Sequence, residues 1–98
     1  MKADAKKAAG KLKSSGWKVS AKKLSRAFKF KDFDDAFAFM TRCAKEIAKL
    51  DHHPEWFNVY NKVDVDLSTH DAGGVTMKDV QLAGIMNKIA APYLKGGK

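Results

Sequence analysis

The spacing of apolar residues changes at Pro54, and this change constrains the fold more than any other feature of the sequence. Over residues 32–50 apolar side chains recur every three or four residues, which is the period of one face of an α-helix. The residues on this stripe are Phe33, Ala36, Phe37, Met40, Ala44 and Ile47. After the proline, apolar and polar residues alternate with the period of a β-strand. The sequence therefore predicts a helix that is followed directly by strands.

The segment after Pro54 is predicted to form a β-hairpin. Its first strand has Trp56, Asn58 and Tyr60 on one face, and its second strand has Val63, Val65, Leu67 and Thr69 on one face. A turn at Asn61-Lys62 pairs Tyr60 with Val63 and His53 with His70. All three histidines of the chain, His52, His53 and His70, then meet at the open end of the hairpin. A loop of three or five residues would shift the pairing by one and weaken this inference.

Two more helices and a second pair of strands are expected. Residues 1–15 are rich in Lys and Ala and predict a loosely held N-terminal helix. Residues 17–20 and 24–30 predict two short strands, and Thr76-Met77-Lys78-Asp79 has the form of a capping box that opens a last helix. The order α-β-β-α-β-β-α predicts an α+β fold. Its four-stranded antiparallel sheet should have three helices packed on one face.

Two of the predicted helices have more apolar surface than a helix packed on one sheet requires. Phe39 and Cys43 lie off the stripe of the central helix, and Val80, Ala83 and Ala90 widen the apolar surface of the last helix. This excess predicts a contact with another helix or subunit. We therefore expect a homo-oligomer, either a dimer or a tetramer.

Length and composition predict one soluble domain over residues 1–98. The single cysteine excludes a disulfide framework and a Cys-rich zinc site. The sequence has neither an apolar run of about 18 residues that could span a membrane nor a recognisable secretory signal. We expect a cytoplasmic protein without membrane partners, and a nuclear location stays open.

The net charge of +8 comes from the N-terminal third of the chain. Residues 1–31 hold 11 Lys or Arg against one acid, whereas residues 32–98 hold 8 against 10. The N-terminal lysines alternate with alanines rather than with aromatic residues, which is typical of a solvated helix face. Direct binding of nucleic acid is therefore not expected.

Four interpretations fit histidines that converge at one place. They could cap the end of the central helix, or they could bind a metal with Asp51 or Asp71, although the helical His-x-x-x-His spacing is absent. They could instead act as general acid and base near neutral pH, a role that suits imidazole. A fourth interpretation is ligand binding beside the aromatic residues Trp56, Phe57 and Tyr60. The residues alone leave these alternatives open.

Several runs of the sequence resemble pterin-4a-carbinolamine dehydratase. The similarity extends from about Gly16 to Ala90 and is carried by Phe30-Lys31-Asp32-Phe33, by the run Lys49-Leu50-Asp51-His52-His53-Pro54-Glu55-Trp56-Phe57 and by Leu67-Ser68-Thr69-His70. The family signature is matched at His52, His53, Pro54, Tyr60, His70 and Asp79. The resemblance implies a lyase that dehydrates 4a-hydroxytetrahydrobiopterin to quinonoid dihydropterin in tetrahydrobiopterin recycling, without a metal or an organic cofactor.

The resemblance also implies roles for individual residues. His52 and His70 would be the acid/base pair, and His53 would chiefly bind and orient the pterin. The substrate pocket would consist of Asp51, His52, His53, Ser68, Thr69, His70 and Asp71. Trp17 would lie at the pocket mouth, and Asp79 would support the second histidine of the pair, although its place in the capping box is an equally sufficient explanation.

Two features depart from the family pattern. Ala48 occupies a position, four residues before His52, that is often acidic or polar in the family, and the segment before Gly16 is richer in lysine than expected. The family also includes animal members that act as dimerisation cofactors of a homeodomain transcription factor. A protein-interaction module without catalysis is therefore the alternative function.

Overall fold

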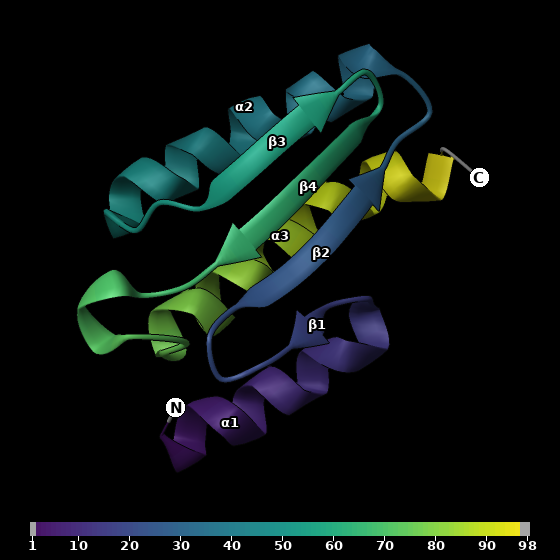
Figure 1. Ribbon diagram of the computed structural model, residues 1–98. Coiled ribbons are helices and arrows are strands. Elements are labelled where there is room, and N and C mark those ends of the chain that lie inside the picture. The colour runs from purple at the N-terminus through teal and green to yellow at the C-terminus, as the bar shows by residue number, and fades with distance from the viewer. Residues whose placement is uncertain (1, 97–98) are drawn as a thin grey trace.

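The computed structural model describes residues 2–96 and has the expected α+β architecture (Figure 1). The helices are α1 (Ala3–Gly10), which continues into a 3-10 turn at Lys11–Ser15, α2 (Phe33–Leu50) and α3 (Met77–Gly96). The strands are β1 (Lys18–Val19), β2 (Leu24–Lys29), β3 (Glu55–Val59) and β4 (Lys62–Leu67). A short 3-10 turn, His70–Ala72, lies between β4 and α3.

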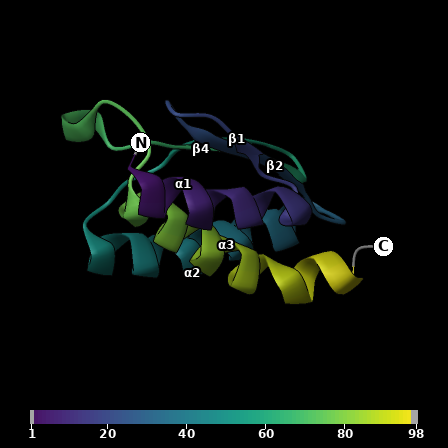
Figure 2. The same cartoon turned by 90° about the horizontal axis from the view of Figure 1, so that it is seen from below.

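The four strands form one antiparallel sheet in the order β1-β2-β4-β3. All three helices lie on one face of this sheet, and the other face is open (Figures 1 and 2). The alternation of apolar and polar residues along the strands explains this layering. Phe28, Val65 and Leu67 point to the buried face, and Asp64 points to the open one. The predicted fold class and layer arrangement are confirmed. Within residues 2–96, no helix combines the length and apolar composition needed to cross a membrane.

The buried face of α2 differs from the predicted stripe. Ala36, Phe39, Cys43 and Ile47 are buried, whereas Phe33 and Phe37 are exposed and stack on each other at 5.6 Å between ring centroids. The predicted stripe and the buried stripe both have helical spacing, so periodicity alone could not tell which one is buried. Contacts of α2 with α3 and with the sheet determine the buried stripe. Ala83 and Ala90 are also buried within the chain. The excess apolar surface, which was predicted to contact another helix or a subunit, therefore packs between helices in the core of the chain.

The hairpin forms as predicted, but its register is shifted by two residues. The turn is Tyr60-Asn61, so Val59 pairs with Lys62, and Trp56 pairs with Val65 rather than Leu67. The Asn61 side-chain amide donates to the carbonyl of Phe30 at 2.8 Å, and the Phe30 N–H donates to the carbonyl of Asn61 at 2.8 Å. This tie to the end of β2 fixes the turn. A shift of two keeps every side chain on its predicted face, but the predicted pairing of the second and third histidines is wrong.

Gly74 lies where the fold leaves no room for a side chain. A Cβ there would lie 2.4 Å from the carbonyl oxygen of Ala21, which also accepts the N–H of Val75 at 3.0 Å. Gly74→Ala should therefore lower the free energy of unfolding by about 1–3 kcal/mol in urea titrations. Gly84→Ala is the matched control, since a Cβ there meets nothing within 4 Å, and it should stabilise helix α3 by about 0.5–1 kcal/mol. Equal losses in both variants would contradict the close approach at Gly74.

Candidate active site

The end of α2 directs the two adjacent histidines. Asp51 follows the helix in the left-handed conformation, with φ 51° and ψ 42°. Its N–H donates to the carbonyl of Ala48 at 3.3 Å, and the N–H of His52 donates to the carbonyl of Ile47 at 3.4 Å. These are the two bonds of a Schellman motif, here with an aspartate in place of the usual glycine. The chain therefore reverses direction at Asp51, three residues before Pro54.

The imidazole of His52 is turned inward against the carboxylate of Asp79. Nε2 of His52 lies 2.6 Å from Oδ1 of Asp79, and the two side chains are 11% and 0% exposed. Oδ2 of Asp79 accepts the hydroxyl of Thr69 at 2.8 Å and the N–H of Thr76 at 2.9 Å. Asp79 thus has both expected local roles, as helix cap and as partner of a histidine. The histidine is His52, however, and not His70.

His53 points away from its neighbour, as adjacent residues of an extended segment do. It is exposed and lines an open groove between α2 and β3. This groove has a volume of about 300 Å³, and its lining residues are Ala44, Ile47, Ala48, His53, Pro54 and Trp56. Ala48, which departs from the family pattern, therefore lines the same groove as His53 and supplies no polar side chain there.

His70 is exposed and begins the 3-10 turn between β4 and α3. The turn is closed by hydrogen bonds from Thr69 N–H to the Gly74 carbonyl at 2.9 Å and from Gly73 N–H to the His70 carbonyl at 3.0 Å. Figure 1 shows this turn and the α2–β3 junction at the same end of the sheet. The structure therefore brings the histidine-bearing segments to one end of the molecule. They are linked through the Asp79 side chain rather than through the hairpin register.

Two residues assigned to the site lie elsewhere. Trp17 is 2% exposed, its indole N–H donates to Oδ1 of Asn87 at 2.8 Å, and its ring packs edge-on against Phe28. Trp17 is therefore a core residue and not part of a pocket mouth. Tyr60 is in the hairpin turn, at the opposite end of β3 from His53. Asp51, Ser68 and Asp71 do lie in the two segments at the histidine end.

Neither a cysteine nucleophile nor a metal site is supported by the residues that the structure describes. Burial raises the pKa of the Cys43 thiol to about 12, so this side chain stays protonated and is not a nucleophile near neutral pH. Residues 2–96 contain no group of three or more His, Cys, Asp or Glu side chains placed to hold a metal ion. The arrangement at the histidine end is suited to proton transfer, because it combines imidazoles with a buried carboxylate.

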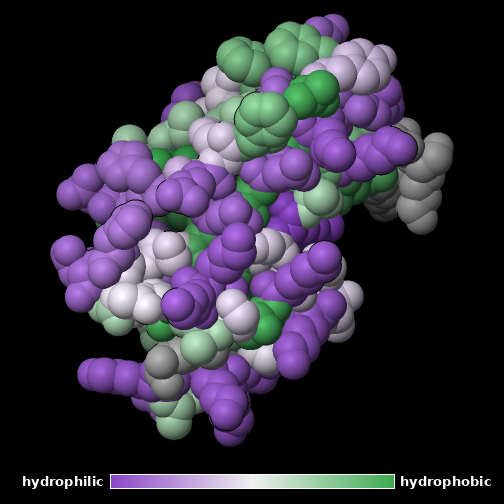
Figure 3. All heavy atoms as spheres, in the orientation of Figure 1, coloured by the Kyte–Doolittle hydropathy of each residue, from purple (hydrophilic) through white to green (hydrophobic). Residues whose placement is uncertain are grey.

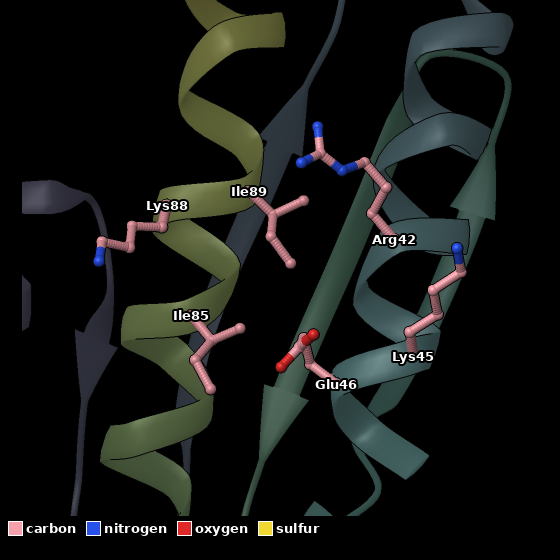
Figure 4. Close-up of a pocket in the computed structure, with 6 residues that line it drawn as sticks. All are labelled: Arg42, Lys45, Glu46, Ile85, Lys88 and Ile89. Atoms are coloured by element: carbon pink, nitrogen blue, oxygen red, sulfur yellow. The ribbon is translucent and has the colours of Figure 1, made fainter. Parts of the chain in front are cut away.

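A second depression lies between α2 and α3 (Figure 4). It measures about 410 Å³ and is lined by Arg42, Lys45, Glu46, Ile85, Lys88 and Ile89. In Figure 4 the guanidinium of Arg42 and the carboxylate of Glu46 point toward the isoleucines of α3, while Lys88 points away. No imidazole lines this groove. The histidine end therefore remains the candidate active site.

Comparisons with known proteins identify a family that this chain matches. Residues 1–89 match the family model described as pterin 4 alpha carbinolamine dehydratase. A relative from Bradyrhizobium sp. (strain BTAi1), provisionally named pterin-4-alpha-carbinolamine dehydratase, is 59% identical over 81 residues, which are 81% of this chain and 82% of the relative. A relative from Sinorhizobium fredii with the same provisional name is 53% identical over 93 residues, covering 92% and 89% of the two chains.

Two solved structures share the fold of this chain. The crystal structure of a Brucella melitensis protein described as a transcriptional coactivator/pterin dehydratase superposes with a TM-score of 0.82 at 46% identity, covering 92% of this chain and 97% of that one. A pterin dehydratase-like protein described as a RuBisCO assembly factor in the alpha-carboxysome shares the fold, with a TM-score of 0.64 at 16% identity over 76% of this chain and 86% of that one.

These similarities place this α+β protein in the dehydratase, or hydro-lyase, class. The chain belongs to the pterin 4 alpha carbinolamine dehydratase family. The family match begins at residue 1, so the Lys-rich N-terminal segment, which was expected to depart from the family, is included in it.

Proposed function

We propose that this protein dehydrates 4a-hydroxytetrahydrobiopterin to quinonoid dihydropterin and water during tetrahydrobiopterin recycling. The observation that carries the proposal is the buried imidazole of His52, hydrogen-bonded to Asp79 at 2.6 Å, at the end of the sheet where the His70 turn also lies. Family membership gives the substrate class. We place the reaction in the cytoplasm, with no metal or organic cofactor and with no membrane or nucleic-acid partner.

The reaction consists of two proton transfers and one bond cleavage. An acid gives a proton to the C4a hydroxyl, the C–O bond breaks and water leaves. A base removes a proton from a ring nitrogen, whose electron pair forms the new double bond. His52 and His70 form this acid/base pair, because imidazole can take either role near neutral pH. After one turnover the acid has lost a proton to the departing water and the base has gained the ring-nitrogen proton, and proton exchange with solvent restores both histidines.

Two segments flank the proposed pterin site. Asp51 to His53 come from the end of α2, and Ser68 to Asp71 come from the end of β4. His53 is exposed and orients the pterin from the groove side. Backbone groups of the second segment supply donors and acceptors to the polar edge of the pterin ring.

A stopped assay of 4a-hydroxytetrahydropterin breakdown tests the proposal. The assay uses a non-nucleophilic buffer at a pH where the spontaneous reaction is slow. Added protein should accelerate the breakdown in proportion to its concentration, and heat-denatured protein should not. Equal rates with native and denatured protein would exclude the dehydratase function.

The alternative is a protein-interaction module without catalysis. One observation favours it, namely the description of the Brucella melitensis relative as a coactivator as well as a dehydratase. An interaction module has no physical need for a buried imidazole ordered by a carboxylate, so the geometry at His52 and Asp79 favours catalysis. Absence of turnover in the assay above would leave this alternative as the better one.

We also propose that the chain forms a homo-oligomer, a dimer or a tetramer, through β3. This strand is one edge of the sheet and contains neither Pro nor Lys to discourage pairing. Phe57 and Val59 on it are 65% and 53% exposed, and Figure 3 shows apolar side chains gathered where β3 ends and α2 begins. A second copy related by a twofold axis would supply both an antiparallel strand and a matching apolar surface.

Sedimentation velocity tests the oligomer. The protein should sediment with the mass of two or more chains, and Phe57→Glu should shift it toward one chain, because a buried charge opposes the contact. Ala27→Glu is the matched control, since Ala27 is exposed on the same open face but in a central strand. A wild-type protein that sediments as one chain would contradict the proposal.

A further inference from the structure

Thr69 stands between the two segments that carry the candidate acid/base pair. Its N–H donates to the carbonyl of Gly74 at 2.9 Å and so anchors the turn that begins at His70. Its hydroxyl donates to Oδ2 of Asp79 at 2.8 Å, and Oδ1 of the same carboxylate lies 2.6 Å from Nε2 of His52. A single residue therefore joins the His70 turn to the imidazole of His52.

The hydrogen bonds around Thr69 run in one direction. The N–H of Lys78 donates to the hydroxyl oxygen of Thr76 at 3.3 Å, and the hydroxyl oxygens of Thr76 and Thr69 are 2.8 Å apart. Because the proton of Thr69 goes to Asp79, the proton of Thr76 must go to Thr69. A carboxylate can only accept hydrogen bonds. Asp79 therefore requires a hydrogen on the ring nitrogen of His52 that faces it.

We propose that Thr69 is a positioning residue for the dehydration. Through Asp79, its hydroxyl keeps the hydrogen of the neutral His52 imidazole on Nε2, so that Nδ1 is the atom that accepts and returns the reacting proton. The physical basis is general, since the hydrogen bond made by one ring nitrogen sets which of the two carries the hydrogen. This inference rests on the proposed function, because it names the atom that would work in that reaction.

Three threonine variants test the role of the hydroxyl. Thr69→Val keeps the shape of the side chain but removes the donor to Asp79, so kcat should fall roughly 10-fold and its pH profile should shift, with little change in KM. Thr69→Ser restores a hydroxyl and should recover most of the loss. Thr41→Val is the matched control, because Thr41 is exposed on α2, and its rates should equal those of the wild type.

The tautomer of His52 can be read without substrate. Nitrogen-15 NMR of histidine-labelled protein distinguishes ring nitrogens that carry hydrogen from those that do not, and the signals lost in His52→Gln identify His52. The wild type and Thr69→Ser should carry the hydrogen on Nε2, and Thr69→Val should show a mixture of both tautomers. This spectrum does not depend on turnover, so an inactive wild type with the expected tautomer would exclude the proposed function alone.

Three results would overturn the inference. The first is a wild-type spectrum with the hydrogen of His52 on Nδ1, which needs no threonine variant and so applies even where Thr69→Val does not fold. The second is a Thr69→Val protein with the rates and the tautomer of the wild type. The third is a Thr69→Ser protein as slow as Thr69→Val, since this would make the hydroxyl irrelevant.

Discussion

Replacing His52 with glutamine should slow dehydration by roughly 100-fold or more, the contribution expected of a general acid or base. The amide N–H of glutamine can still donate to Asp79, which otherwise loses its partner at 2.6 Å. The amide cannot act as a general acid or base near neutral pH. The variant should therefore separate catalysis from stability, with a urea midpoint close to that of the wild type and a much lower kcat in the stopped assay.

Variants of His53 and His70 are the comparisons for this result. His70→Ala should lose activity to a similar extent, because His70 is the other member of the proposed pair. His53→Ala should weaken pterin binding more than it lowers kcat, and both side chains are exposed, so neither replacement should unfold the protein. Wild-type turnover in His52→Gln and His70→Ala would exclude the acid/base assignment. Equal weakening of pterin binding by all three substitutions would contradict the proposal that His53 chiefly binds the pterin.

The fold could be predicted because its signals are local. The side chain of Asp32 caps α2 by accepting the N–H of Asp35 at 2.9 Å, and the change of period at Pro54 separates α2 from the hairpin. The hairpin register could not be predicted, since it depends on the bond between Asn61 and Phe30, 31 residues apart. The buried face of α2 was ambiguous for a similar reason: both candidate stripes are apolar, and only packing against α3 and the sheet distinguishes them.

The candidate site was predicted in part. The three histidines could be placed at one end of the sheet, although the pairing used to place them was wrong. The contact between His52 and Asp79 joins residues 27 positions apart and depends on the left-handed conformation of Asp51. No local sequence pattern predicted that conformation. The spacing from Thr76 to Asp79 did identify the helix cap. The hydroxyl of Thr69 had no sequence signal of its own, because its role follows from three-dimensional contacts alone.

Asp79→Ala should lower the free energy of unfolding by about 3 kcal/mol or more, since breaking a buried network usually costs this much. The carboxylate is 0% exposed and accepts from Thr69, from Thr76 and, in the inferred tautomer, from His52. Its removal leaves these part-buried donors without this acceptor and also removes the Asp79 half of the capping box of α3. The same variant should lose most of its turnover, because His52 would no longer be held in one tautomer.

Urea titration measures the loss of stability, and Asp34→Ala is the matched control. Asp34 also lies in the first turn of a helix, but it is exposed, so its removal should cost no more than about 1 kcal/mol through the helix dipole. A large difference between the two variants separates the buried network from the general preference for acids at helix starts. A similar small loss in both would show that the contacts of Asp79 contribute little to the fold, and would also weaken the argument that Asp79 orders His52.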